Sequence, residues 1–266
     1  MPKNPEKISK QPLLEARGIT KKFGAITALE DVNLKLYPNE VLGVVGDNGA
    51  GKSTLMKILS GLYKQSSGEL FFEGNKINLE SPRNAQDIGI EMVYQDLALA
   101  GNLSIHENIY LGREPGWKFF GMKIVDSVLS RKMAAEHLKK LHIEVKSVEQ
   151  NVENLSGGQA QAVAIARATA FNSRVVVMDE PTAALAIKEV GKVLDLIKNL
   201  KQQGVSVILI SHRLDDVFYV CDRVMSLFHG KNFEEAPLAK TNRNEVIGWL
   251  MGTKGHTKSL AHDRID

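Results

Sequence analysis

The chain has 266 residues, of which 43% are hydrophobic and 24% charged, an ordinary balance for a soluble globular fold. This length allows one large domain or two modest ones, and a formal net charge of +3 argues against a dominant nucleic-acid-binding surface. Cys221 is the sole cysteine, so no intrachain disulfide is expected and a reducing cytosol fits best.

Both ends of the chain are polar, and we expect residues 1–12 and 253–266 to be flexible. The N-terminus has no apolar segment of the kind found in signal peptides. No apolar run approaches the roughly 20 residues that a membrane helix needs. Any role at a membrane would therefore depend on partners that span it. Without an internal repeat, residues 13–252 are predicted to form a single nucleotide-binding unit.

A phosphate-binding loop is the first chemical signal along the chain. Val41–Val45 is a short apolar run, typical of a buried strand, and a helix is predicted over Lys52–Leu59. The glycines between them allow successive backbone N–H groups to face a phosphate, and the helix start adds its positive dipole end. Lys52 would contact the β- and γ-phosphates, and the Ser53 hydroxyl would ligate Mg²⁺. The loop residues are Gly46, Asp47, Asn48, Gly49, Ala50, Gly51, Lys52, Ser53 and Thr54.

The region from about residue 97 to 170 is predicted to be mostly helical and inserted between sheet strands. Asp126 or Ser127 is expected to cap a helix whose apolar positions Leu129, Met133, Leu138 and Leu141 follow helical spacing. Gln95 stands at the seam where the insertion begins, where its amide could reach Mg²⁺ or an attacking water. Taken alone, a glutamine at this place would more often be merely solvated.

A second anion site is predicted at Ser156-Gly157-Gly158-Gln159, which precedes the apolar helix 160–170. Ser156 is a natural helix cap, and the glycines expose backbone N–H groups. The insertion carries this site away from the phosphate loop, so one chain cannot easily place both sites on one γ-phosphate. Two chains facing each other can, which predicts a dimer with ATP at its interface. The four residues alone would also fit a simple capped turn.

Strands and helices alternate after residue 171, which predicts a largely parallel sheet with helices on its faces. Strands are expected at Arg174–Met178, Val205–Ile210 and Arg223–Phe228, and helices at Lys188–Gln203 and Leu214–Val220.

Three polar side chains follow two of these strands. Asp179 is placed to hold Mg²⁺, and Glu180 to polarise the attacking water as general base. His212 follows the next strand and would donate to the γ-phosphate. The alternatives are an acidic strand cap, which the upstream phosphate loop disfavours, and a structural histidine, which the order of the strands disfavours.

In this order, the phosphate loop, Leu155–Gln159 and Val175–Glu180 resemble the ATP-binding subunits of ABC transporters, over roughly residues 13–250. The resemblance implies a P-loop NTPase fold of the α/β class. It comprises a mostly parallel sheet core, an antiparallel β subdomain and an inserted helical subdomain. It also implies two protomers sandwiching two ATP molecules head to tail.

The resemblance further implies residue roles and cofactors, which are ATP and Mg²⁺. Phe23 would stack on adenine, and Gln95 would bind Mg²⁺ or water while linking the ATP state to a membrane subunit. Glu180 and His212 would be catalytic, and Ser53 and Asp179 would hold the metal. The ATP of the other protomer would be held by Ser156, Gly157, Gly158 and Gln159.

A narrower resemblance is to single-cassette ATPases of bacterial monosaccharide importers. It is carried by Val93–Leu99, Asn108–Glu114 and Asp179–Leu185. It implies a homodimer at the cytoplasmic face of the cell membrane, bound to permease subunits and acting indirectly with an external sugar-binding protein. No nucleic-acid partner is implied. Two departures from the wider family, Ala160 and Ala186, leave the dimer contacts and the coupling of the two sites open.

For two segments of the insertion, the sequence is compatible either with docking to a partner or with packing inside the insertion. Leu97–Arg113 would contribute to a permease-facing surface or to the insertion's core, and the aromatic cluster Trp117, Phe119 and Phe120 favours packing. The rival functions are a soluble non-transport ABC ATPase, a non-hydrolysing ATP-binding regulator and a phosphotransferase. The first usually carries basic arms or coiled coils, and the last has no use for Leu155–Gln159.

Overall fold

The computed structural model describes residues 11–119 and 122–253, with side chains left out for residues 118, 119 and 122. Residues 1–10 and 254–266, which include most of the two ends expected to be flexible, lie outside the described residues. Within the described ranges, no helix has the length and apolar character needed to cross a membrane.

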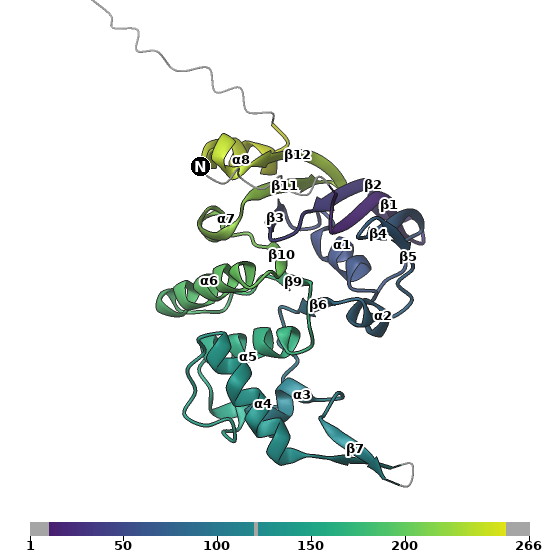
Figure 1. The fold of residues 1–266 in the computed structure, drawn as a ribbon. Coiled ribbons are helices and arrows are strands. Elements are labelled where there is room, and N and C mark those ends of the chain that lie inside the picture. Colours follow the sequence, from purple (N-terminus) through teal and green to yellow (C-terminus); the bar gives the residue numbers. More distant parts are fainter. Residues whose placement is uncertain (1–10, 120–121, 254–266) are drawn as a thin grey trace, which may run out of the picture.

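A six-stranded sheet occupies the centre of the molecule (Figure 1). Its order is β12-β11-β3-β10-β9-β6, and every neighbouring pair is parallel except β11 and β12. The strands are β3 (Val41–Gly46), β6 (Ile90–Val93), β9 (Val175–Asp179), β10 (Ser206–Ile210), β11 (Arg223–Phe228) and β12 (Lys231–Pro237). The mostly parallel core predicted from the alternation of strands and helices is confirmed.

A second sheet is antiparallel and packs on one face of the first. Its order is β2-β1-β4-β5, formed by β1 (Leu14–Phe23), β2 (Ile26–Leu36), β4 (Ser67–Phe72) and β5 (Asn75–Ile77). Helix α1 (Lys52–Leu59) shares one hydrophobic cluster with both sheets, in which Leu55 and Met56 meet Leu14 and Val177. The antiparallel subdomain implied by the resemblance is therefore present.

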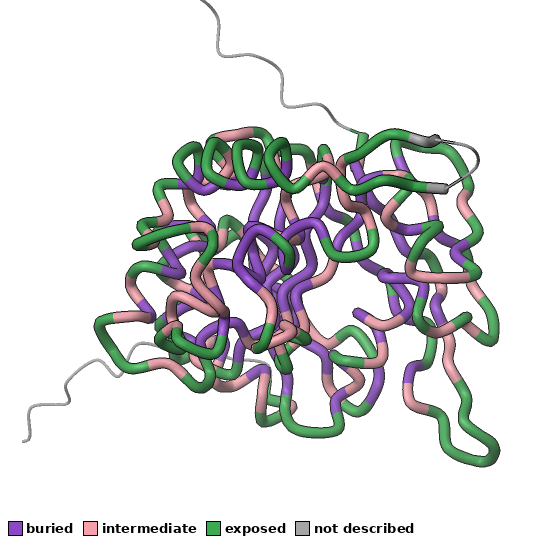
Figure 2. Tube along the Cα trace, turned by 90° about the horizontal axis from the view of Figure 1, so that it is seen from below, coloured by how far each residue is buried: buried purple, intermediate pink, exposed green. Residues whose placement is uncertain are grey.

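The opposite face of the central sheet is covered by helices (Figure 1). Because successive strand residues point to opposite faces, Val175 and Val177 of β9 enter the cluster around α1, whereas Val176 and Met178 enter the helical one. The helices of that second cluster are α3 (Ile105–Tyr110), α4 (Ser127–Lys140), α5 (Gly157–Thr169) and α6 (Ile187–Gln202). Figure 2 shows buried residues along the central strands and exposed residues on the outer turns.

The last two helices of the chain pack on the central sheet beside β3 and β11. Helices α7 (Leu214–Val220) and α8 (Arg243–Leu250) share a small cluster with β3 and β11, built around Val217, Val246 and Trp249. The remaining short elements are α2 (Pro82–Asp87) and the 3-10 turns Val152–Asn154 and Leu238–Lys240.

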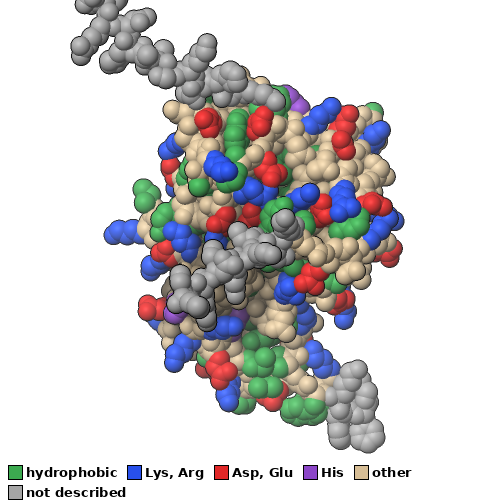
Figure 3. Space-filling model, turned by 45° about the horizontal axis from the view of Figure 1, so that its top comes forward, with side chains coloured by type: hydrophobic (Ala, Val, Ile, Leu, Met, Phe, Trp, Pro, Cys, Tyr) green, Lys and Arg blue, Asp and Glu red, His purple; other side chains and the backbone are tan. Residues whose placement is uncertain are grey.

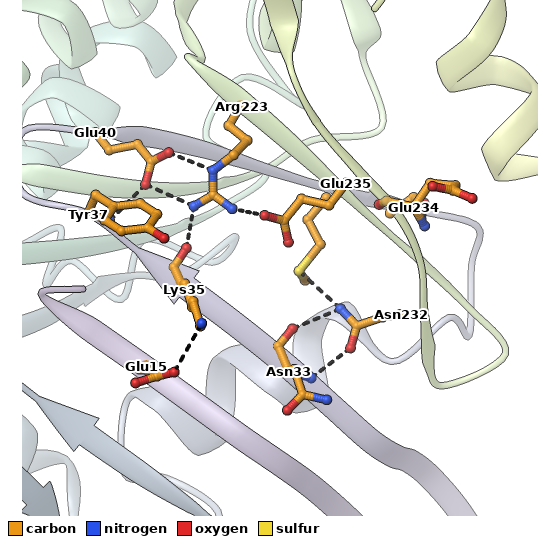
Figure 4. Close-up of polar contacts among 11 residues, drawn as sticks. Glu15, Asn33, Lys35, Tyr37, Glu40, Arg223, Asn232, Glu234 and Glu235 are labelled. Atoms are coloured by element: carbon orange, nitrogen blue, oxygen red, sulfur yellow. Dashed lines mark hydrogen bonds and ion pairs between the residues drawn. The ribbon is translucent and has the colours of Figure 1, made fainter. Parts of the chain in front are cut away.

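An ion-pair network joins the two sheets (Figure 4). The Arg223 guanidinium, at the start of β11, donates to both carboxylate oxygens of Glu40, at 2.8 and 3.0 Å. It also bonds Glu235 of β12 and the backbone carbonyl of Lys35 in β2. Glu40 in turn accepts from the backbone amide of Tyr37 at 2.7 Å. The Arg223 side chain, which is 11% exposed, thus links the strand that leads into the phosphate loop with the antiparallel sheet.

The inserted region differs from the expectation in two respects. A hairpin of β7 (Gly116–Phe119) and β8 (Met122–Val125) interrupts the helices and projects from the molecule (Figure 1). Its aromatic and β-branched residues favour a strand, as the direct pairing of Trp117 with Ile124 illustrates. Trp117 is 54% exposed, so packing is the wrong expectation for this residue. The side chains of Phe119 and Phe120 lie outside the described residues.

The buried face of α4 is the second difference. Asp126 caps this helix as predicted, accepting from the Leu129 amide at 2.9 Å. Leu138 is buried, but Leu129 and Met133 are exposed, because Ser130 and Ala134 face the core instead. These smaller residues let α4 approach α3, where Ser130 contacts His106. Hydrophobic side chains consequently gather on the surface over this helical part (Figure 3).

Candidate functional site

The carboxyl ends of four parallel strands bring the predicted catalytic residues to one edge of the sheet. Gly46 ends β3, Glu180 follows β9, and His212 lies two residues after β10. Gln95 lies two residues after β6. All four residues line a single cavity of about 510 Å³, together with Asp47 and Asn48. Parallel pairing makes this convergence unavoidable, because all four strands end at the same edge.

The phosphate loop has glycine at two positions whose backbone conformation other residues rarely adopt. Gly51 has φ +98°, and a Cβ there would stand 2.5 Å from Leu29 Cδ2 and 2.9 Å from the Ala28 carbonyl oxygen. Gly49 has φ +82°. Lys52 begins α1, and its Nζ donates to the carbonyls of Gly46 and Asp47 at 2.7 and 3.0 Å.

The electrostatic environment of Lys52 is acidic. Burial lowers the pKa of its ammonium group, whereas the nearby carboxylates of Glu180, Asp179 and Asp47 act in the opposite direction. The pKa of Asp179 is raised, first by burial and then by the neighbouring Glu180. Lys52 and a hydrogen bond from Ser53 oppose that rise. A cation here would relieve the repulsion between the two adjacent carboxylates.

Glu180 and His212 form a direct pair. His212 Nδ1 lies 3.1 Å from Glu180 Oε2, with the histidine side chain 56% exposed and the glutamate 20% exposed. The Glu180 backbone has φ +51°, unusual for a residue other than glycine, and its amide donates to the Ile210 carbonyl at 3.0 Å. This turn directs the carboxylate into the cavity instead of continuing the strand.

Gln95 belongs to a loop that is tied to the helical insertion. Arg167, in the last turn of α5, donates to the carbonyls of Leu97 and Ala98, both at 2.8 Å. Burial lowers the pKa of Arg167, and Glu91 nearby opposes that effect. The sequence reasoning missed Arg167, because an arginine inside an apolar helix carries no motif. Its partners became visible only with the fold.

Phe23 ends β1 and does not line the cavity of the phosphate loop. Its ring is 44% exposed and meets Tyr63 edge to face, with the ring centroids 5.5 Å apart. Lys21 Nζ lies 4.9 Å from the centre of the Phe23 ring. Phe23 therefore offers a planar, partly exposed aromatic surface. Tyr63 is a second aromatic residue of this surface, which the sequence analysis did not identify.

The structure does not bring Ser156–Gln159 to the phosphate loop of the same chain. Ser156 caps α5, its Oγ accepts from the Gln159 amide, and the Gln159 side chain accepts from the Ser156 amide. This reciprocal capping box presents the helix start to a different cavity of about 480 Å³, between α5 and α6. The separation of the two predicted anion sites that the dimer argument assumed is observed.

Comparison with known proteins identifies the family of this chain. A sequence profile described as ABC transporter matches residues 29–183, more than half of its length. The chain belongs to the ABC transporter family.

Its relatives in the family include import proteins. The chain is 45% identical to the xylose/arabinose import ATP-binding protein XylG of Sulfolobus acidocaldarius, covering 88% of this chain and 92% of that protein. It is 46% identical to the fructose import ATP-binding protein FrcA of Rhizobium meliloti, covering 82% and 85%. For the ribose import ATP-binding protein RbsA of Caldanaerobacter subterraneus the identity is 39%, and the match spans only 48% of that longer protein.

Solved structures of ATP-binding cassettes share the fold of this chain. A nucleotide-free ATP-binding cassette from an ABC transporter superposes with a TM-score of 0.78 at 27% identity, covering 90% of this chain and 95% of the other. The ATP-binding cassette MJ0796, a dimer in a post-hydrolysis state with ADP and Pi, gives a TM-score of 0.72 at 31% identity, covering 85% and 98%. The fold class predicted from the motifs is confirmed.

Proposed function

We propose that this chain is the ATP-hydrolysing subunit of an ABC importer, and that it couples ATP binding and hydrolysis to the uptake of a sugar through a separate permease. The observation that supports it best is the Glu180–His212 pair in the same cavity as the phosphate loop. Glu180 would accept a proton from the attacking water as general base. His212 would hold that carboxylate in place and donate to the γ-phosphate.

The residues at the loop fit a magnesium ion. The Ser53 hydroxyl lies close enough to the Asp179 carboxylate to oppose the rise of its pKa, and both are oxygen ligands of the kind that Mg²⁺ prefers. No group of three or more His, Cys, Asp or Glu side chains in the described part could hold a metal, so the remaining ligands would be phosphate oxygens and water. Mg²⁺, when bound, would neutralise charge on the β- and γ-phosphates. Gln95 would reach the metal or the water.

Two protomers would complete each site. The Ser156–Gln159 segment faces another cavity than the phosphate loop of its own chain, so it would bind the γ-phosphate held by the partner. ATP would bridge the protomers and ADP could not, which links closure of the dimer to chemistry through differential contacts. The dimeric state of the MJ0796 cassette supports this arrangement.

A groove between the sheet core and the helical insertion suits the permease. It has a volume of about 390 Å³ and is lined by α2, the start of the Gln95 loop and the segment after α3. Within it the buried Glu91 pairs with Arg113 at 2.7 Å, and Leu111 is 49% exposed. Ile105 and Ile109 of α3 are buried in the insertion's core, and Ile109 also lines the inner wall of the groove. A permease loop seated here would contact the Gln95 loop that Arg167 ties to α5.

The proposed cargo is a monosaccharide, because the relatives are import proteins for xylose or arabinose, fructose and ribose. The chain would work at the cytoplasmic face of the membrane, with a sugar-binding protein on the other side. Reconstitution in vesicles with the permease and the binding protein, offering each sugar in turn, tests this. We expect one sugar to stimulate ATP hydrolysis in wild type. In Glu180→Gln, turnover should fall about 10²–10⁴-fold with ATP binding retained. Binding without hydrolysis in wild type would favour a regulator instead.

A further inference from the structure

Glu189, in the first turn of α6, lies against the start of α5. A Cβ placed on Gly158 would stand 2.8 to 3.0 Å from the Cβ, Cγ and Cδ atoms of Glu189. A Cβ placed on Gly157 would stand 3.9 Å from Oε2 of Glu189. Helices α5 and α6 lie next to each other in the fold (Figure 1), and Ser156, Gly158 and Glu189 line one cavity. Gly158 therefore leaves room for the Glu189 side chain of the same chain.

The Glu189 carboxylate bridges the starts of both helices. The Ser156 hydroxyl and the Gly158 and Ala186 amides lie close enough to this carboxylate to stabilise its charge, and they lower the pKa of Glu189. The carboxylate is thus ionised at neutral pH. Ala186 is the N-cap residue of α6 and makes no side-chain capping hydrogen bond, so Glu189 supplies the negative charge that a helix start favours. The same charge also stabilises the start of α5.

The donors that hold Glu189 are the ones that the proposed function assigns to the partner's ATP. The Ser156 hydroxyl has one proton, and it cannot be donated to the carboxylate and to a γ-phosphate at once. The two anions would also repel each other at such short range. A γ-phosphate can therefore occupy this helix start only after the Glu189 side chain has turned away.

We propose that Glu189 is a positioning residue that occupies the second anion site from within the chain and so opposes closure of the ATP dimer. This inference rests on the proposed head-to-tail dimer. In the free protomer the Glu189 side chain lies beside the donors of Ser156 and Gly158, which stabilises the open state. Closure then requires a γ-phosphate on the partner, and ADP offers none. The contact would limit idle hydrolysis by protomers that meet away from the permease.

The test compares dimer formation in Glu180→Gln and in Glu180→Gln/Glu189→Gln, with hydrolysis suppressed in both. Glutamine has the shape of glutamate and still accepts from the Ala186 amide, but it lacks the charge. Sedimentation with ATP and EDTA, over a range of protein concentrations, gives the dimer dissociation constant. We expect the added change to lower this dissociation constant about tenfold. Glu136→Gln, an equal charge change at an exposed site on α4, should leave the constant unchanged.

Two further readouts separate this role from general damage to α6. ADP should produce no dimer in any variant, and the affinity of dilute monomer for ATP should be unchanged, because the chain's own phosphate loop is intact. With Glu180 present, Glu189→Gln should reach half-maximal specific activity at a lower protein concentration than wild type. A merely structural role would weaken the dimer instead.

The outcomes distinguish the two proposals. Equal dimer constants with and without Glu189→Gln, or a weaker dimer in the double variant, would overturn the role of Glu189 and leave the sandwich standing. A dimer that appears only in the double variant would support the inference. Monomers at every concentration in both variants, with ATP demonstrably bound, would overturn the head-to-tail dimer and this inference together.

Discussion

Replacing Arg223 by methionine tests the network that joins the two sheets (Figure 4). Both Arg223 and Glu40 side chains are only 11% exposed, and the guanidinium contacts both oxygens of the Glu40 carboxylate. Without Arg223, the Glu40 charge would stay buried with the Tyr37 amide as its remaining partner in this network. Removing one partner of a buried ion pair costs about 3–5 kcal/mol. We therefore expect the free energy of unfolding to fall by about that amount.

Urea unfolding followed by far-UV circular dichroism measures this loss. With a slope of about 3 kcal/mol per molar urea, the midpoint of Arg223→Met should fall by about 1–1.7 M. Adding Glu40→Gln removes the unpaired charge, so the double variant should regain part of the loss. Arg17→Met provides a control, because Arg17 pairs with Glu15 from a side chain that is 55% exposed, so its loss should leave the midpoint nearly unchanged. Equal midpoints for Arg223→Met and Arg17→Met would refute the reasoning.

Three further changes address the site. The pKa of Asp179 is raised in the fold, so its ionised form is disfavoured there and stability should fall as pH rises through that pKa. Asp179→Asn should raise the melting temperature of nucleotide-free protein at neutral pH, which calorimetry would show, while ATP turnover is lost. Gly51→Ala should abolish ATP binding in a fluorescence titration, because its Cβ would meet Leu29 and the backbone at φ +98°. Arg167→Met should lose two charge-assisted hydrogen bonds and destabilise the fold by about 3 kcal/mol in urea, and an unchanged midpoint would contradict this.

Much of the fold and of the site was predictable because its signals are local. The phosphate loop is a contiguous segment whose glycines, Lys52 and Ser53 act through backbone geometry and one helix start. The capping of α5 by Ser156 is equally local, since both partners lie within four residues. The strand β9 and the helix α6 were predictable from the pattern of apolar residues, and their observed ends lie within two residues of the predicted ones. Short-range physics of this kind can be worked out without knowledge of the fold.

Long-range contacts needed the tertiary structure. In the sequence, Glu189 is an ordinary acidic residue in the first turn of a predicted helix. Only the packing of α6 on α5 brings its side chain to Gly158. Arg223 and Glu40 are 183 positions apart, and nothing near either predicts the other. The burial of Ala134 in place of Met133 was decided by how closely α4 approaches its neighbours, because helical spacing allows more than one face. The sequence determined which chemistry the chain carries, while packing decided which charges meet, because that depends on elements distant along the chain.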